Sequence, residues 1–192
     1  MNLPNYLTLS RIVLTFVIMA FLFAKNFAMT CAAFLLFLAA CATDFLDGWV
    51  ARKKGLISDF GKIMDPLADK VLVVGLFLTF VQLQLMGAWV VVVIVVREFL
   101  ITGMRIFALR RGVVLAAESA GKHKTVSQMG AIICILIFLI LRESGSYFSF
   151  WNETFESSFR MGIHVMVGLA VFFTVYSGLV YLWRNRHLIR TL

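Results

Sequence analysis

The chain has 192 residues, of which 61% are hydrophobic and 15% are charged, and its formal net charge is +8. Soluble domains are typically about 45–50% apolar and about 25% charged, and a domain of this size cannot bury so large an apolar surface. The composition therefore excludes a soluble enzyme, a disordered regulator and a secreted disulfide scaffold, and indicates an integral membrane protein. In such a protein, the cationic excess is typical of cytoplasmic loops facing anionic lipid and not of nucleic-acid binding.

Six apolar stretches are long enough to cross a bilayer, since a spanning helix needs about 20 mostly apolar residues. In chain order, we expect them at about residues 6–24, 27–50, 65–83, 88–107, 125–141 and 161–183. The sequence therefore predicts an all-α, polytopic membrane protein with six transmembrane helices. The length predicts a single domain that covers residues 1–192.

Basic residues are concentrated in and around alternate loops. The clusters after the second, fourth and sixth spans are Arg52, Lys53, Lys54 and Lys62; Arg105, Arg110, Arg111, Lys122 and Lys124; and Arg184, Arg186 and Arg190. The intervening loops carry few basic residues, which glutamates offset. By the positive-inside rule, both termini and the basic loops are expected in the cytoplasm. Because no organelle transit peptide precedes the first span, we expect a bacterial inner or plasma membrane.

All five aspartates of the chain lie between residues 44 and 69. Asp44 and Asp47 are three residues apart and share one face of a helix, and Asp65 and Asp69 are four apart on the next helix. One isolated pair of this kind is usually a helix cap or a solvated face. Two pairs on consecutive spans, joined by a short polar turn, can instead face each other near the cytoplasmic surface.

Four carboxylates in a small volume repel one another, and each costs a few kcal/mol to hold in or near hydrocarbon. A divalent cation, or two, would compensate them, and oxygen ligands favour Mg²⁺, with Mn²⁺ as the alternative. Such ions point to chemistry on a phosphate group. Gly48 and Ala51 lie on the same side of the helix as the first pair. Their small size allows either a ligand or another helix to approach closely.

The segment fits the pattern D-x2-D-G-x2-A-R-x8-G-x3-D-x3-D at every fixed position. The matching residues are Asp44, Asp47, Gly48, Ala51, Arg52, Gly61, Asp65 and Asp69. This pattern resembles the signature of the CDP-alcohol phosphotransferase family. The length and the six-span layout of the chain are also similar to those of the family, so the resemblance covers essentially the whole sequence.

The resemblance implies transfer of a phospho-alcohol from a CDP-alcohol to an acceptor hydroxyl, with release of CMP. It implies two metal ions between the four motif aspartates, and Asp69 as the general base that takes the proton of the acceptor. It also implies that Gly48, Arg52 and Ser58 contact the CDP part of the donor, with Ala51 and Gly61 at the same site. A carboxylate bound to metal is a weaker base, so Asp69 must retain a free oxygen.

The N-terminal run from Pro4 to Arg11 resembles the opening of one subgroup of this family, the bacterial phosphatidylglycerophosphate synthases. This likeness implies that Asn5 and Thr8 help to hold the nucleotide of CDP-diacylglycerol. The alternative is a plain helix start, with Arg11 reaching to the membrane interface.

The fourth span carries Arg97 and Glu98 inside an apolar run that resembles the same subgroup. A charged pair there is costly unless it has a function or a partner, so a purely structural ion pair is the alternative. Lys122 and Lys124, with Arg105, make a candidate pocket for a phosphate dianion. Ordinary positive-inside charge is the alternative. The expected acceptor-binding residues are Arg97, Thr102, Arg105, Lys122 and Lys124.

A cationic pocket favours a phosphorylated acceptor, and the subgroup resemblance implies glycerol 3-phosphate. The expected reaction is CDP-diacylglycerol plus glycerol 3-phosphate giving phosphatidylglycerophosphate plus CMP, in phosphatidylglycerol biosynthesis. The same chemistry with inositol phosphate, serine or phosphatidylglycerol as acceptor remains open. A divalent-cation transporter and a scaffold that binds lipid headgroups are more distant alternatives. Faces of small residues predict a homodimer.

Overall fold

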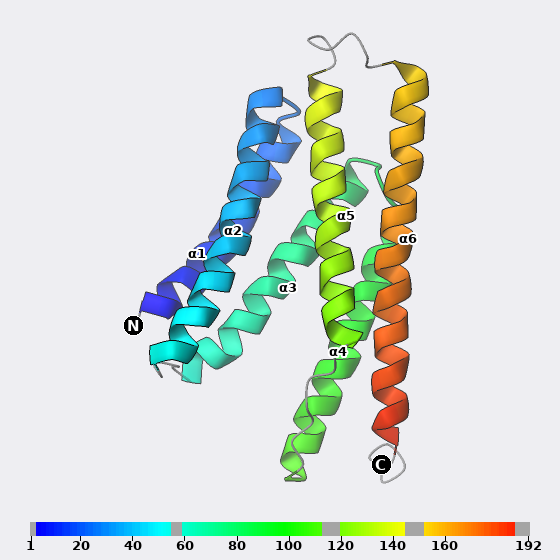
Figure 1. The fold of residues 1–192 in the computed structure, drawn as a ribbon. Coiled ribbons are helices and arrows are strands. Elements are labelled where there is room, and N and C mark those ends of the chain that lie inside the picture. Colours follow the sequence, from blue (N-terminus) through cyan, green and yellow to red (C-terminus); the bar gives the residue numbers. More distant parts are fainter. Residues whose placement is uncertain (1–2, 55–58, 113–119, 145–151, 187–192) are drawn as a thin grey trace.

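The computed structural model describes residues 3–54, 59–112, 120–144 and 152–186, with side chains described for 9–43, 68–112, 121–144 and 152–186. These residues form six helices and no strand, as the sequence predicts (Figure 1). The helices are α1 (Leu3–Phe23), α2 (Phe27–Lys54), α3 (Asp59–Gln82), α4 (Ala88–Arg110), α5 (Ala120–Glu143) and α6 (Glu153–Arg184).

The helices α3, α5 and α6 begin several residues earlier than the apolar stretches that predicted them. Hydropathy detects only the apolar part of a helix, whereas the polar first turns are helical too. The start of α6 shows the cause. The side chain of Asn152 accepts a hydrogen bond of 2.8 Å from the backbone N–H of Phe155, and Glu153 and Glu156 lie in the first turn, where acidic residues suit the helix dipole.

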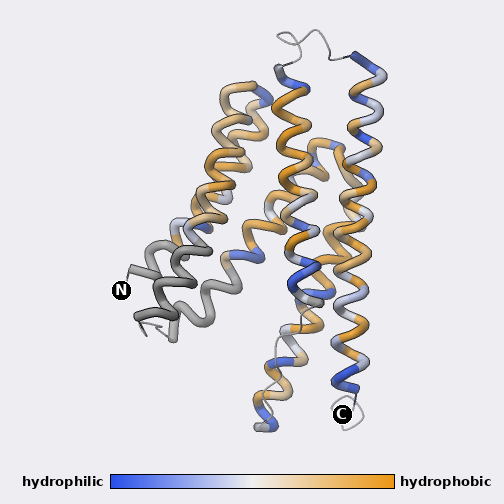
Figure 2. Tube along the Cα trace, viewed as in Figure 1, coloured by the Kyte–Doolittle hydropathy of each residue, from blue (hydrophilic) through white to orange (hydrophobic). Residues whose placement is uncertain are grey.

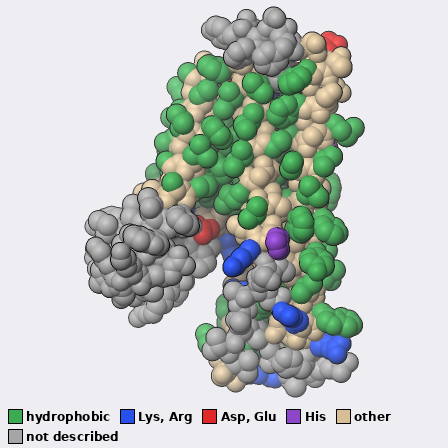
Figure 3. Space-filling model, in the orientation of Figure 1, with side chains coloured by type: hydrophobic (Ala, Val, Ile, Leu, Met, Phe, Trp, Pro, Cys, Tyr) green, Lys and Arg blue, Asp and Glu red, His purple; other side chains and the backbone are tan. Residues whose placement is uncertain are grey.

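Two of the described helices are long and apolar enough to cross a membrane by length and composition. These are Gly121–Glu143 and Glu153–Arg184, with mean hydropathies of 2.1 and 2.0. Two shorter apolar stretches, Leu9–Phe23 and Phe27–Thr43, lie in α1 and α2. Hydrophobic side chains also cover most of the face drawn in Figure 3, and lysine and arginine side chains gather towards its lower end. These apolar helices agree with the membrane protein that the composition indicates.

The helices pack in two connected groups. Helix α1 lies against α2 and α3, and α6 lies against α4 and α5, while α2 and α3 contact α5. Phe37, Phe77, Phe80 and Phe138 are fully buried in the common core. Figure 1 shows that the end of α2 and the start of α3 lie at the same end of the molecule as the start of α1.

A glycine sets the spacing between α1 and α3. A Cβ on Gly75 would lie 2.9 Å from Cγ2 of Thr15 and 3.3 Å from the sulfur of Met19, which is too close for the first contact. The two helices therefore approach closely along this line. The close approach also brings Arg11, one turn before Thr15, within reach of the motif residue Asp69, which lies almost two turns before Gly75.

Candidate active site

A cavity of about 410 Å³ opens between α2, α3, α4 and α5. One part of its wall is apolar and includes Phe37, Leu38, Val73, Met129 and Ile133. The other part is polar and is formed by Arg11, Asp69, Lys70, Glu98, Lys124, Thr125 and Gln128. Such a cavity suits a ligand that has a charged head and apolar chains.

Asp69 of α3 lies in the polar wall of this cavity. Arg11 of α1 donates a hydrogen bond of 2.6 Å from a terminal guanidinium nitrogen to Oδ1 of Asp69. The side chain of Arg11 is only 4% exposed, whereas that of Asp69 is 46% exposed. Arg11 is therefore packed inside the protein and paired with Asp69, whereas the expected role of Asn5 and Thr8 stays a prediction. Arg11 holds a partly exposed carboxylate at the edge of the cavity.

The other motif residues lie on α2 and α3, and their side chains are outside the described residues. Asp44, Asp47, Gly48, Ala51 and Arg52 belong to the last three turns of α2, and Gly61 and Asp65 to the first two turns of α3. Asn5 and Thr8 lie on α1, also without described side chains, and Ser58 is outside the described residues altogether. The backbone therefore carries both aspartate pairs on helices, as the pattern requires.

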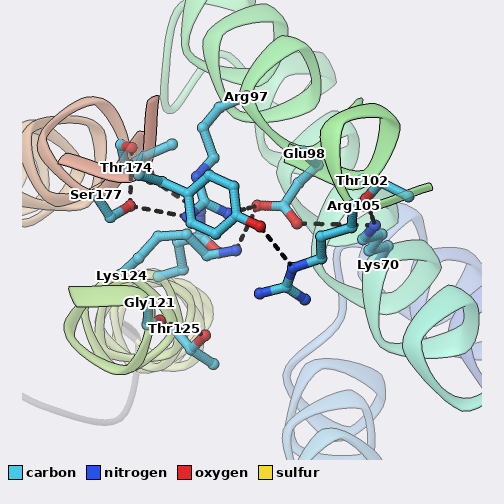
Figure 4. A network of polar contacts seen from close by, with 12 residues as sticks. Lys70, Arg97, Glu98, Thr102, Arg105, Gly121, Lys124, Thr125, Thr174 and Ser177 are labelled. Carbon is cyan, nitrogen blue, oxygen red and sulfur yellow. Dashed lines mark hydrogen bonds and ion pairs between the residues drawn. The ribbon is translucent and has the colours of Figure 1, made fainter. Parts of the chain in front are cut away.

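A partly buried ionic network also lies at this cavity (Figure 4). Its centre is Glu98 of α4, whose side chain is 16% exposed. Oε1 of Glu98 accepts hydrogen bonds from Arg97, at 2.9 Å, and from Nζ of Lys124 in α5. The other oxygen, Oε2, lies 3.9 Å from Nζ of Lys70 in α3, which also donates a 2.8 Å hydrogen bond to Thr102. A single carboxylate therefore joins three helices.

Arg97 extends this network to the last helix. It donates a hydrogen bond of 3.1 Å to the hydroxyl of Ser177 in α6. The next residue, Gly178, makes room for the arginine, because a Cβ there would lie 3.1 Å from Cγ of Arg97. Beside it, Gln128 of α5 donates a buried 3.0 Å hydrogen bond to Thr174. These contacts fix α4, α5 and α6 relative to one another at the level of the cavity.

Arg105 lies on the same face of α4 as Glu98 and Thr102, because the three residues are spaced at i, i+4 and i+7. Its Nε donates to the hydroxyl of Tyr181 at 3.4 Å, and its guanidinium carbon lies 5.6 Å from the centre of that ring. Tyr181 is buried, so the arginine is anchored against α6 next to the network (Figure 4).

The two lysines at the start of α5 differ in position. Lys124 is 12% exposed and contacts Glu98, whereas Lys122 is exposed and takes no part in the network. Residues two apart on an α-helix point to nearly opposite sides, so one of the two faces outward. Of the five residues expected to bind the acceptor, the structure brings Arg97, Thr102 and Lys124 into direct contact with the network. It places Arg105 beside them and Lys122 outside.

Sequence reasoning missed Lys70 as a site residue and treated Glu98 only as a partner for Arg97. The available signal was a lysine directly after the last motif aspartate and a glutamate within an apolar helix. Both residues line the cavity. In this described part of the chain, three cationic side chains, Lys70, Arg97 and Lys124, converge on one carboxylate, and Arg105 lies farther along the same face of α4. This excess of positive charge suits a dianion such as a phosphate, next to a carboxylate that can accept a proton.

Figure 2 shows polar segments in α3, in α4 and at the start of α5 at about the same level of the molecule. Asp69, Lys70, Glu98 and Lys124 from these helices meet in the cavity. Polar groups within apolar helices are expensive and mark a functional site by default. The cavity is therefore the candidate active site.

Comparison with known proteins relates nearly the whole chain to the family that the aspartate pattern resembles. The family model described as CDP-alcohol phosphatidyltransferase matches residues 1–180. A relative from Bacillus subtilis (strain 168) is 36% identical over 99% of this chain and 98% of its own length. A relative from Rickettsia felis is 35% identical over 94% of this chain and 93% of its own length. A third, from Treponema pallidum, is 37% identical over 74% of this chain and 67% of its own length.

All three relatives carry the name CDP-diacylglycerol–glycerol-3-phosphate 3-phosphatidyltransferase. The family model, the two nearly full-length relatives and the complete aspartate pattern agree with one another. The chain belongs to the CDP-alcohol phosphatidyltransferase family.

Proposed function

We propose that the protein transfers the phosphatidyl group of CDP-diacylglycerol to glycerol 3-phosphate and releases CMP. The observation that carries this proposal is the cavity in which Asp69 and a cationic network share one polar wall. The names of the nearly full-length relatives support glycerol 3-phosphate as the acceptor. The product would be phosphatidylglycerophosphate, the precursor of phosphatidylglycerol.

The phosphate of the acceptor would bind at the cationic side of the cavity. Lys124 and Arg105 would supply charge there, with Arg97 and Thr102 behind them in the same network. Charge-assisted hydrogen bonds to a phosphate are roughly twice as strong as neutral ones. Lys122, exposed at the start of α5, would act at longer range by attracting the anion towards the cavity.

Asp69 would accept the proton of the acceptor hydroxyl as its oxygen attacks the phosphorus of the phosphatidyl group. The bond from that phosphorus to the bridging pyrophosphate oxygen breaks, and CMP leaves with the electron pair. General-base catalysis of this kind contributes about 10²–10⁴-fold. Arg11 orients the carboxylate through Oδ1 and is buried, so it acts as a positioning residue.

The donor set of the motif fits a hard divalent cation. Asp44, Asp47, Asp65 and Asp69 offer only carboxylate oxygens, which Mg²⁺ prefers and Mn²⁺ accepts. The helix ends that carry them lie at one end of the molecule (Figure 1), and Asp69 borders the cavity. Two ions held there would neutralise charge on the pyrophosphate and improve CMP as a leaving group. Dependence on metal is also general in this family.

CDP-diacylglycerol would bind with its nucleotide near the motif helices and its acyl chains along the apolar wall. Asn5, Thr8, Gly48, Ala51, Arg52, Ser58 and Gly61 would form the nucleotide site. The apolar wall includes Leu38, Met129 and Ile133. This division follows the polarity of the cavity, and it allows the chains to enter sideways from the bilayer.

The six helices would all span the membrane, with both termini and the cavity's polar end in the cytoplasm of a bacterial cell. The gathering of lysine and arginine side chains at one end (Figure 3) supports this orientation. A homodimer is the proposed assembly. Gly162 and Gly168 are exposed on α6, and a Cβ on either would meet nothing within 4 Å, so a second helix could pack there.

The test is CMP release by the purified protein in detergent, with CDP-diacylglycerol, Mg²⁺ and glycerol 3-phosphate. Asp69→Asn is expected to lower turnover by at least about 100-fold, because it removes the base and one carboxylate charge of the proposed metal site, and folding should be retained because the side chain is partly exposed. Arg110→Gln, an exposed residue in the last turn of α4, is the matched control. A chelator is expected to abolish release.

The same assay is repeated with other acceptors in place of glycerol 3-phosphate. Release that requires inositol phosphate, serine or phosphatidylglycerol in place of glycerol 3-phosphate would keep the mechanism and change the substrate. If folded protein gives no release with any acceptor, and metal ions enter sealed vesicles that contain it, the proposal fails in favour of a transporter.

A further inference from the structure

We propose that Glu98 is a positioning residue that holds two ammonium groups, those of Lys70 and Lys124, at the cavity wall, and that Lys70 thereby becomes a second ligand of the acceptor phosphate. This inference rests on the proposed function and adds one binding residue and one positioning residue to it. Its starting point is that Lys70, Glu98 and Lys124 come from three different helices and all line the cavity.

The first step is the geometry at Glu98. Lys124 is bonded to Oε1 and Lys70 lies 3.9 Å from Oε2, so the two ammonium groups approach one carboxylate from its two oxygens. An anion that enters the cavity beside this carboxylate therefore meets both ammonium groups. Glu98 supplies the negative charge that draws both ammonium groups to this place, and Thr102 adds a hydrogen bond to Lys70.

The second step is the difference between the two lysines. Lys124 is 12% exposed and is tied to Glu98, whereas Lys70 is 34% exposed, with the looser ion pair and a hydrogen bond to Thr102. The more exposed lysine can exchange part of its contact with Glu98 for a contact with a phosphate. Lys70 is thus suited to bind the ligand, and Lys124 provides the fixed charge behind it.

The third step is the position of Lys70 in the chain. It directly follows Asp69, and both side chains line the same cavity. An acceptor whose phosphate contacts Lys70 therefore has its hydroxyl end close to the proposed base. A small phosphorylated alcohol has the right length for both contacts, since a few bonds separate its phosphate from its reacting hydroxyl. Holding both ends lowers the entropic cost of reaching the reactive geometry.

The charges around Glu98 do not cancel. Arg97 also donates to Glu98, so a single carboxylate faces three cations. Removing one partner of a buried ionic cluster leaves uncompensated charge and is usually destabilising. Glu98 therefore has a structural effect as well, and the experiment must separate that effect from positioning.

The test compares Glu98→Gln, Glu98→Asp and Lys70→Gln with the unaltered protein by steady-state kinetics in each substrate. For Glu98→Gln and Lys70→Gln, the KM for glycerol 3-phosphate is expected to rise about tenfold or more, with the KM for CDP-diacylglycerol within about twofold. Glu98→Asp is expected to restore part of the affinity, since it keeps the charge. Equilibrium binding of radiolabelled glycerol 3-phosphate should weaken in parallel.

Glu156→Gln is the matched control. It removes the same charge from a glutamate that pairs with Arg160 in the first turns of α6, far from the cavity. If Glu98→Gln does not fold, Glu98→Asp tests the positioning role, because it keeps the charge and displaces the carboxylate. Lys70→Gln, at a partly exposed site, still tests the new ligand by itself.

The outcomes separate the inference from the function on which it rests. No glycerol 3-phosphate-dependent release from the unaltered protein would overturn the proposed function. Normal turnover of the unaltered protein, with an unchanged or lowered KM for glycerol 3-phosphate in folded Glu98→Gln and Lys70→Gln, would overturn the inference alone. A lowered KM would mean that Glu98 competes with the phosphate. Equal changes in both KM values would mean a purely structural role.

Discussion

The two sides of the cavity's polar wall are built in different ways. On the side of α1 and α3, a partly exposed carboxylate, Asp69, is held by one buried arginine, Arg11. On the side of α4, α5 and α6, several cations converge on one buried carboxylate, Glu98. The first side presents an acid that can exchange protons or ligands with its surroundings. The second side presents a rigid positive charge.

This difference matches the two tasks that the reaction needs. A base must be accessible to the hydroxyl that it deprotonates, and its other contacts must leave it basic. A phosphate site must instead be preorganised, so that its cationic side chains are already in place when the ligand binds. Substitutions on the α1–α3 side should therefore change mainly kcat, and substitutions on the α4–α6 side should change mainly the KM for glycerol 3-phosphate.

After Asp69, the largest effect is expected at Lys124. Lys124→Gln removes a largely shielded charge from Glu98, so the KM for glycerol 3-phosphate should rise more than about tenfold. The free energy of unfolding should fall by about 2 kcal/mol, the value of a hydrogen bond to a charged group, because Arg97 and Lys70 still compensate Glu98. The matched change Lys122→Gln, two residues away and exposed, should raise that KM only about twofold, because it removes long-range attraction alone. Kinetics and denaturant unfolding of both variants measure the contrast. Equal effects of the two substitutions would contradict the assignment.

A smaller effect, on a different parameter, is expected at Arg11. Arg11→Gln removes the donor that orients Asp69, so kcat should fall about tenfold while the KM for glycerol 3-phosphate changes little. Arg11→Lys keeps the charge and should recover part of the loss. The measurement is the split between kcat and KM, with the unfolding temperature recorded alongside. A rise in KM at constant kcat would place Arg11 with the phosphate site instead.

The smallest effect is expected at Gly178. A Cβ there would lie 3.1 Å from Cγ of Arg97, so Gly178→Ala should displace the arginine and lower the free energy of unfolding by about 1 kcal/mol. The same change at Gly103, on α4, meets nothing within 4 Å and should raise the free energy of unfolding by up to about 1 kcal/mol, because alanine is the better helix former. Equal stability of the two variants would show that α6 can shift away from α4 without cost.

The α1–α3 side of the cavity was predictable to a large extent from the sequence. The spacing of Asp44, Asp47, Asp65 and Asp69 follows helical periodicity within one stretch of chain, so local pattern alone places each pair on one helix face. Even so, the burial of Arg11 against Asp69 was not predicted. Its position depends on the close approach of α1 to α3 at Gly75, which is a tertiary contact.

The α4–α6 side was predicted only in part. The basic residues at the start of α5 predicted that Lys122 and Lys124 both bind the phosphate. In the structure, Lys124 contacts Glu98, whereas Lys122 is exposed on the opposite side of the helix. Lys70 was not predicted as a site residue at all. Its partners Glu98 and Thr102 lie on another helix, at a sequence separation of 32 residues for Thr102, and no local pattern encodes such a contact.

The sequence by itself determined that this is a helical membrane protein, where its apolar helices lie and which family signature it carries. Hydropathy and short-range spacing depend only on residues that are close in the sequence, so they can be determined without the tertiary structure. Only the tertiary structure decided which charges meet in the cavity and which face outward. The reason is physical: buried charges are tolerated only where partners from other helices compensate them, and helix packing selects those partners.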